Sequence, residues 1–153
     1  MGQASFGFKM VDRGYAQVRP LLDLALAEGR PVEVGLYFAE AETLTYYDGF
    51  FPASGLALNT HLDHRVINLY KAPQQQDLLR RQIEQSMAWG AGYAVDHLAL
   101  YPFSKPRAYR ERVMDRLFEQ LVITDALITE YGFPIYIENT FDDMDFFHEF
   151  VCV

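Results

Sequence analysis

The chain alternates short apolar runs with longer segments whose apolar residues recur at helical spacing. This alternation is typical of β/α units, in which each buried parallel strand is followed by an amphipathic helix. The pattern predicts an α/β fold of about five parallel strands with outer helices. The runs that predict strands are "FGFKMV" at 6–11, "VEVGLYF" at 32–38, "LALNTH" at 56–61, "HLALYPF" at 97–103 and "FPIYIEN" at 133–139.

The intervening segments predict helices whose ends are marked by glycine or proline. Pro20 is expected near a first turn, because proline disrupts a helix interior. The segment at 39–55 has room for about two turns before its Pro and Gly. The helical segments are 15–30, 39–55, 75–92, 107–131 and an amphipathic piece at 142–151.

Composition narrows the classes of protein. At 153 residues, half of them hydrophobic, the chain is expected to form one domain over 1–153. Its net charge of −8, without any Lys/Arg cluster longer than two, disfavours nonspecific binding to nucleic-acid phosphates. The single cysteine, Cys152, cannot form an internal disulfide, and neither a leader nor a membrane-length apolar run is present, so a soluble cytoplasmic protein is expected.

Polar residues follow three of the predicted strands: His61 after "LALNT", Tyr101 after "LAL" and Glu138 after "IYI". Ligands and catalytic groups of parallel α/β folds gather at such carboxyl ends. A carboxylate there needs a cation or hydrogen bonds, and a divalent metal bound by His and Glu would supply the cation. Two alternatives stay open, because Glu138 can instead cap a helix or pair with a basic residue, and His61 can be a structural histidine.

Other titratable residues give weaker signals. Asp63 and His64, in the loop after the third run, either orient a ligand or are solvated. His97 is expected at the start of its strand, on the face of a barrel associated with stability. Phosphate-binding glycine loops and the HExxH and GxSxG motifs are absent from the sequence.

Several stretches resemble one family. "LNTHLDHRVINL" at 58–69 resembles the third-strand motif of endonuclease IV-type enzymes, and 75–102 is similar to their next helix and strand. "IYIENT" at 135–140 is similar to their fifth strand, whose Glu binds metal, and 6–29 extends the similarity over nearly the whole chain. The wider group is the xylose isomerase-like TIM barrel superfamily, which also holds sugar isomerases and epimerases.

The resemblance implies a metal site with Glu138 and His61 as ligands and catalytic residues, and Mn, Mg, Co or Zn as the ion. Tyr101 stands where the nuclease-type motif has a metal-binding His. That departure and the acidic surface favour a sugar or sugar-phosphate isomerase or epimerase acting on a small polyol or ketose. The residues expected to contact the substrate are Tyr101, Asn139, His64 and Tyr37.

Length is the largest departure from the resemblance. A full barrel has eight strands and about 250 residues, whereas this chain ends after its fifth unit. The resemblance therefore implies a partial TIM (β/α) barrel that is incomplete as a monomer. Either the chain is a fragment of a longer barrel, or it forms a homo-oligomer through exposed strand edges. Two alternatives remain: a non-catalytic binder of a small ligand, with a cavity ringed by Tyr37, Tyr101 and Phe103, and an endonuclease IV-like abasic-site nuclease.

Overall fold

Five strands form one parallel sheet in the order β1-β2-β3-β4-β5. The computed structural model describes residues 7–10, 14–36, 40–67, 75–97 and 107–138. Because chain neighbours are also sheet neighbours, every connection advances one position across the sheet in the same direction. This confirms the α/β fold expected from the sequence. The strands are β1 (Phe8–Met10), β2 (Val32–Gly35), β3 (Leu58–His61), β4 (Ala94–Asp96) and β5 (Ile135–Ile137).

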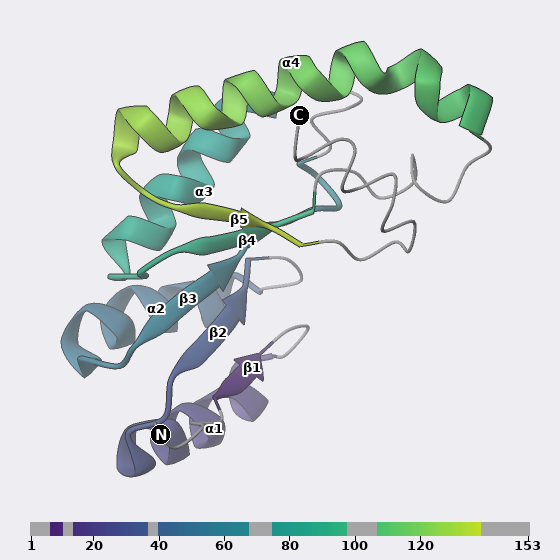
Figure 1. The fold of residues 1–153 in the computed structure, drawn as a ribbon. Coiled ribbons are helices and arrows are strands. Elements are labelled where there is room, and N and C mark those ends of the chain that lie inside the picture. Colours follow the sequence, from purple (N-terminus) through teal and green to yellow (C-terminus); the bar gives the residue numbers. More distant parts are fainter. Residues whose placement is uncertain (1–6, 11–13, 37–39, 68–74, 98–106, 139–153) are drawn as a thin grey trace, which may run out of the picture.

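Helices connect the strands and lie around the outside of the curved sheet (Figure 1). The bounds of the last helix agree with the predicted segment 107–131. Among the described residues, no helix is both long enough and apolar enough to cross a bilayer. The helices are α1 (Tyr15–Glu28), α2 (Ala41–Ser54), α3 (Gln76–Ala88) and α4 (Arg107–Tyr131).

Helix α2 is longer than the two turns expected from its sequence. Thr43, Tyr47 and Phe51 recur every four residues and are all buried, so one face of the helix packs into the core. This packing outweighs the breaking effect of Pro52, which lies in the last turn. Pro20, expected near the first turn of α1, lies in its second turn.

Glycines end the helices and set where the next strand begins. Gly29, Gly55, Gly90 and Gly132 all have positive φ, between 60° and 81°, a conformation that glycine adopts without a steric penalty. Gly29, Gly55 and Gly132 are each followed three residues later by the first residue of a strand. Gly90 is followed four residues later by Ala94, the start of β4.

The two faces of the sheet differ in character. Residues that point outward, such as Val34 and Leu58, are buried against the helices and build the core. Residues that point inward are largely polar, and Tyr136 on this face is 59% exposed. The inner face therefore presents functional groups to whatever occupies the barrel interior. Its described members include Lys9, Glu33, Asn59, His61, Val95 and Tyr136.

The fourth strand differs from its prediction. The structure places β4 at Ala94–Asp96, so the expectation of a strand that starts at His97 is wrong. Residues 98–103 of the predicted run and the predicted helix at 142–151 lie outside the described residues. The shift moves His97 from the start of a strand to the carboxyl end of one.

Candidate metal centre

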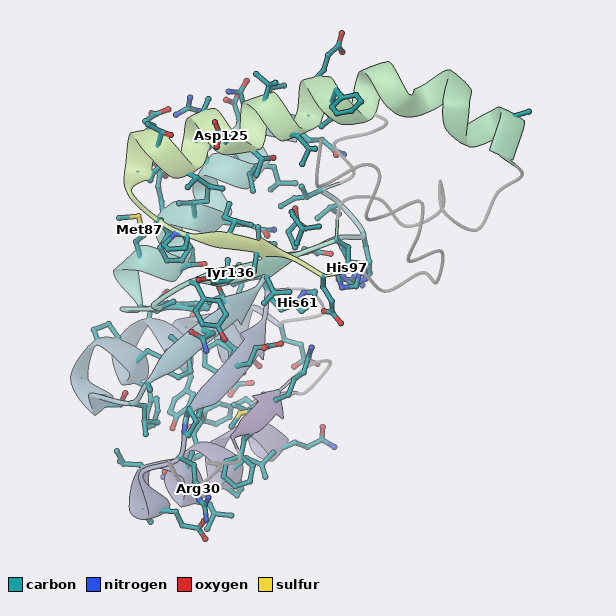
Figure 2. All side chains as sticks on the ribbon, in the orientation of Figure 1. Arg30, His61, Met87, His97, Asp125 and Tyr136 are labelled. Atoms are coloured by element: carbon teal, nitrogen blue, oxygen red, sulfur yellow. The ribbon has the colours of Figure 1, made fainter. Side chains whose placement is uncertain are left out.

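Three strand ends meet at the carboxyl edge of the sheet. His61 is the last residue of β3, His97 directly follows β4, and Glu138 directly follows β5. The parallel register pairs His61 with Val95, two residues before His97, so these side chains project from one face and one end of the sheet. Figure 2 shows His61 and His97 beside each other at this end.

The side chains bring three potential ligand atoms into a compact triangle. Nε2 of His61 lies 3.1 Å from Nε2 of His97 and 3.3 Å from Oε2 of Glu138. Nε2 of His97 lies 3.4 Å from the same carboxylate oxygen. Two imidazole nitrogens and one carboxylate oxygen from three different strands therefore converge on one point.

The contacts of His61 indicate which of its two ring nitrogens is protonated and which carries a lone pair. Nδ1 lies 3.1 Å from the carbonyl oxygen of Leu62, and because a carbonyl only accepts, Nδ1 carries the proton and donates it. A neutral His61 then directs the lone pair of Nε2 at the carboxylate of Glu138. Two acceptors at 3.3 Å repel each other unless a proton or a cation lies between them.

The environment keeps the groups in the protonation states that metal ligands need. Burial, with His64 and His61 alongside, lowers the pKa of His97 from 6.5 to about 4, so its ring is neutral at pH 7. Burial alone would raise the pKa of Glu138, but His97, Lys9 and the neighbouring ring of His61 together lower it. Ligands must be deprotonated to bind a metal, and these two groups are.

The triangle has the dimensions of a tetrahedral zinc site. Zinc binds imidazole nitrogen and carboxylate oxygen at roughly 2.0–2.2 Å, which places tetrahedral ligands about 3.3 Å apart. Catalytic zinc sites use three protein ligands and leave the fourth position to water or substrate. His61, His97 and Glu138 therefore fit a divalent ion with an open position.

Asp63, in the loop after β3, makes its hydrogen bonds within that loop and to α3. Its carboxylate accepts hydrogen bonds from the backbone and the guanidinium group of Arg65 at 3.1–3.2 Å. Its own backbone N–H donates to Oε1 of Gln82 at 2.9 Å. Asp63 therefore anchors the loop rather than orienting one of the three ligands.

A cavity of about 620 Å³ adjoins the triangle on the inner face of the sheet. Its wall includes Glu138 and the ion pair between Lys9 and Glu33. Nζ of Lys9 lies 2.8 Å from Oε1 of Glu33. Tyr93 and Tyr136 form another part of the wall, with ring centroids 4.9 Å apart and planes at 85°. This volume is in the range of small-molecule sites, and its wall combines charged and aromatic groups.

Three of the site residues predicted from the sequence lie together in the structure, and the other three lie outside the described residues. His61 and Glu138 come together as described, and His64 lies beside them in the turn after β3. Nitrogens of His61, His64 and His97 all lie within 4.8 Å of one another. The remaining candidates, Tyr37, Tyr101 and Asn139, lie outside the described residues.

His97 is the site residue that sequence reasoning missed. The residue that follows β4 is His97 rather than Tyr101, so the expectation that this strand end lacks a histidine is wrong. The helix-ending Gly90 was the available signal, because strands start three or four residues after each such glycine. That spacing starts the strand at Tyr93 or Ala94, which puts "AVD" in the strand and leaves His97 near its carboxyl end.

A D-tagatose 3-epimerase-like protein of known crystal structure is similar to this chain, with a TM-score of 0.68 at 15% sequence identity. The match covers 95% of this chain but 60% of that protein, so the chain spans about three fifths of its length. Neither a protein-family model nor a curated protein sequence matches the chain. At this identity the likeness concerns the fold. The chain has a partial (β/α) barrel fold, similar to the fold of a D-tagatose 3-epimerase-like protein.

Proposed function

We propose that this chain provides a divalent-metal site in a sugar isomerase or epimerase that acts on a small polyol or ketose. The observation that carries the proposal is the triangle of His61, His97 and Glu138, with edges of 3.1–3.4 Å. The fold shared with a D-tagatose 3-epimerase-like protein supports the sugar class of substrate. A bound divalent ion would act there as a Lewis acid that polarises substrate oxygens.

The donor set favours some ions over others. Two imidazole nitrogens suit zinc and cobalt, and the carboxylate of Glu138 adds an oxygen ligand that suits manganese, whereas magnesium prefers oxygen ligands and retains most of its water. The single carboxylate of Glu138 leaves a positive net charge at a divalent site, which suits a substrate that binds through oxygen. We therefore propose zinc, cobalt or manganese at this site.

The neighbouring cavity supports the proposed size and polarity of the substrate. Lys9 and Glu33 offer a hydrogen-bond donor and acceptors, and the rings of Tyr93 and Tyr136 offer apolar surface. A sugar has hydroxyl groups around its rim and C–H groups on its faces, so such a wall can contact both. Glu138 belongs to the triangle and also lines the cavity, which would bring a ligand in the cavity next to the ion.

Metal binding is the first test of the proposal. Wild-type protein is expected to take up close to one equivalent of zinc or cobalt, measured by titration calorimetry and by elemental mass spectrometry. Glu138→Gln is expected to weaken binding more than roughly 100-fold, because loss of even an outer partner of a metal ligand costs roughly 10–100-fold. Glutamine has the same length but lacks the charge that the site supplies.

A matched control is Glu130→Gln on α4. Glu130 is paired with Arg80 and is not one of the three ligand residues. This variant is expected to bind metal as the wild type does. Wild-type protein that remains free of metal at millimolar concentrations of the ion would contradict the proposal, and so would equal losses of metal affinity in the two variants.

Metal-loaded assemblies should then exchange the hydrogen next to a ketose carbonyl with deuterium from solvent, measured by NMR.

A second candidate function is favoured by one observation. An imidazole follows β4, as it does in the endonuclease IV-type pattern, so a nuclease acting at abasic sites is the alternative proposal. The net charge of −8 opposes it. Cleavage of an abasic duplex, with affinity that falls steeply as salt rises, would favour the nuclease. Deuterium exchange into a ketose without such cleavage would favour the epimerase.

We also propose that another copy of the chain supplies further strands. In the described part of the chain, β1 and β5 end the sheet, and strand edges without neighbours pair readily. Light scattering is expected to give a mass above that of one chain, 17.6 kDa, at micromolar concentration. A uniform monomer under these conditions would contradict this expectation.

A further inference from the structure

His64 contacts both histidines of the proposed metal site. Its ring stacks on that of His97, with centroids 4.3 Å apart and planes only 9° from parallel. It meets the ring of His61 edge-on, with centroids 5.6 Å apart and planes at 71°. The half-buried His64 therefore packs against the rings that carry two of the three ligand atoms.

The backbone holds His64 in this place. Its N–H donates to the carbonyl of Leu62 at 2.9 Å. The next turn is closed by the N–H of Ile67, which donates to the carbonyl of Asp63 at 2.7 Å. Asp63 is in turn tied to Arg65 and to Gln82 of α3. A short loop with this many bonds can fix the position of a ring that it carries.

The stacked geometry separates His64 from the ligands. An imidazole nitrogen binds a metal through a lone pair that lies in the plane of the ring, at about 2.0–2.1 Å. An ion in the plane of His97 lies outside the parallel plane of His64, so these two rings cannot bind the same ion as arranged. The 70° angle between His61 and His97, by contrast, lets their in-plane lone pairs converge.

We propose that His64 is a positioning residue that fixes the ring orientation of His97 by stacking, and so directs Nε2 of His97 at the ion. The inference rests on the proposed metal site for its functional consequence. His61 has its own orienting contact, the hydrogen bond from Nδ1 to the carbonyl of Leu62. His64 does the equivalent for His97 through its ring face, and its nitrogens are not required as ligands.

Two substitutions at position 64 test the proposal through metal affinity. His64→Phe keeps a flat ring that can stack, and it is expected to bind cobalt and zinc within a few-fold of the wild type. His64→Ala removes the ring and is expected to lose roughly 10–100-fold, as other partners that orient metal ligands do. The visible absorption of bound cobalt is expected to be unchanged in the Phe variant and altered in the Ala variant.

The possible outcomes separate the roles of His64. Equal losses in the Phe and Ala variants would mean that a nitrogen of His64 binds the ion, which overturns the proposal. Wild-type affinity in the Ala variant would overturn it as well. His64→Gln, which has similar length but no ring, replaces the Ala variant if that variant does not fold by circular dichroism, and it is expected to lose affinity to the same extent.

Ring orientation can also be measured without metal, so failure of the metal site and failure of this inference are distinguishable. In the metal-free wild type, the NMR chemical shifts of the His97 ring protons are expected to be changed by the ring current of the stacked His64 ring. His64→Phe is expected to keep a ring-current shift, and His64→Ala to lose it. Wild-type protein that shows the shift but takes up no metal would contradict the proposed function alone. Identical His97 shifts in wild type and the Ala variant would overturn the positioning role.

Discussion

Asp96→Asn is expected to raise the free energy of unfolding of the metal-free protein at about pH 8, by up to about 4 kcal/mol. Asp96 is 2% exposed at the end of β4, where its Oδ1 accepts a hydrogen bond from the backbone N–H of His97 at 2.8 Å. Burial raises its pKa from 3.8 to about 7, against the opposing effect of that hydrogen bond. Asparagine keeps the shape and the acceptor oxygen but removes the buried charge.

The gain is expected to grow with pH. Below pH 3.8 the carboxyl of Asp96 is protonated in the folded and unfolded chain, and no charge is buried. Between 3.8 and about 7 the unfolded chain loses the proton first, so the free energy of unfolding of the wild type falls as pH rises. The lowered pKa of His97 acts in the opposite direction: its contribution to stability is present above pH 6.5 and is lost as pH falls to about 4.

The two residues are therefore expected to offset each other in the wild type, which should show a weak dependence of stability on pH. In Asp96→Asn only the effect of His97 remains, so stability is expected to rise between about pH 4 and 6.5. Denaturant unfolding across this range, with a chelator present, measures the effect. His97→Ala is the complementary control, in which stability should fall as pH rises towards 7. If Asp96→Asn raised the free energy of unfolding by the same amount at both ends of this pH range, the raised pKa of Asp96 could not be the cause.

Trp89→Ala is expected to lower the free energy of unfolding by about 3–5 kcal/mol. Trp89 is 2% exposed and follows α3, and its ring centroid lies 5.3 Å from that of Tyr47 and 5.8 Å from that of Phe51. Its Nε1 donates a hydrogen bond to Oδ1 of Asp48 at 2.8 Å. Because total stability of a domain is typically about 5–15 kcal/mol, this variant should be close to unfolding in urea at low concentration.

Trp89→Phe separates packing from hydrogen bonding at the same position. Phenylalanine keeps a ring against α2 but has no donor for Asp48, which still accepts a hydrogen bond from Nε2 of Gln85 at 2.8 Å. The loss attributable to the hydrogen bond is therefore expected to be about 1 kcal/mol. Urea unfolding measures the free energy of unfolding of both variants. Equal losses in the Ala and Phe variants would show that packing of the ring against α2 does not account for the loss.

Most elements of the fold could be predicted because their signals are local. The bounds of α4 agree with the prediction, and the predicted runs contain β1, β2, β3 and β5. The error at β4 arose because "HLALYPF" is as apolar and as rich in strand-forming residues as "GYAVDHL". Hydrophobicity could not choose between them, whereas the spacing of three or four residues from each helix-ending glycine to the next strand could.

The candidate site was predicted in part. Glu138 and His61 could be named because a polar residue directly after an apolar run marks a strand end, and strand ends of a parallel sheet share one edge. His97 could not be named, because an error of three residues in the start of a strand moves it to the opposite end of the sheet. The role of His64 was out of reach, since stacking depends on side-chain orientation.

The sequence by itself determined the order of the strands and helices and the type of chemistry to expect, because periodicity, helix-ending glycines and strand-end residues all act within a few residues of chain. Only the tertiary structure decided which side chains meet. His61 and Glu138 are 77 residues apart in the chain, yet their atoms approach to 3.3 Å. That distance depends on the register of three strands and the curvature of the sheet, and these follow from how the helices pack against the outer face, which no single segment encodes.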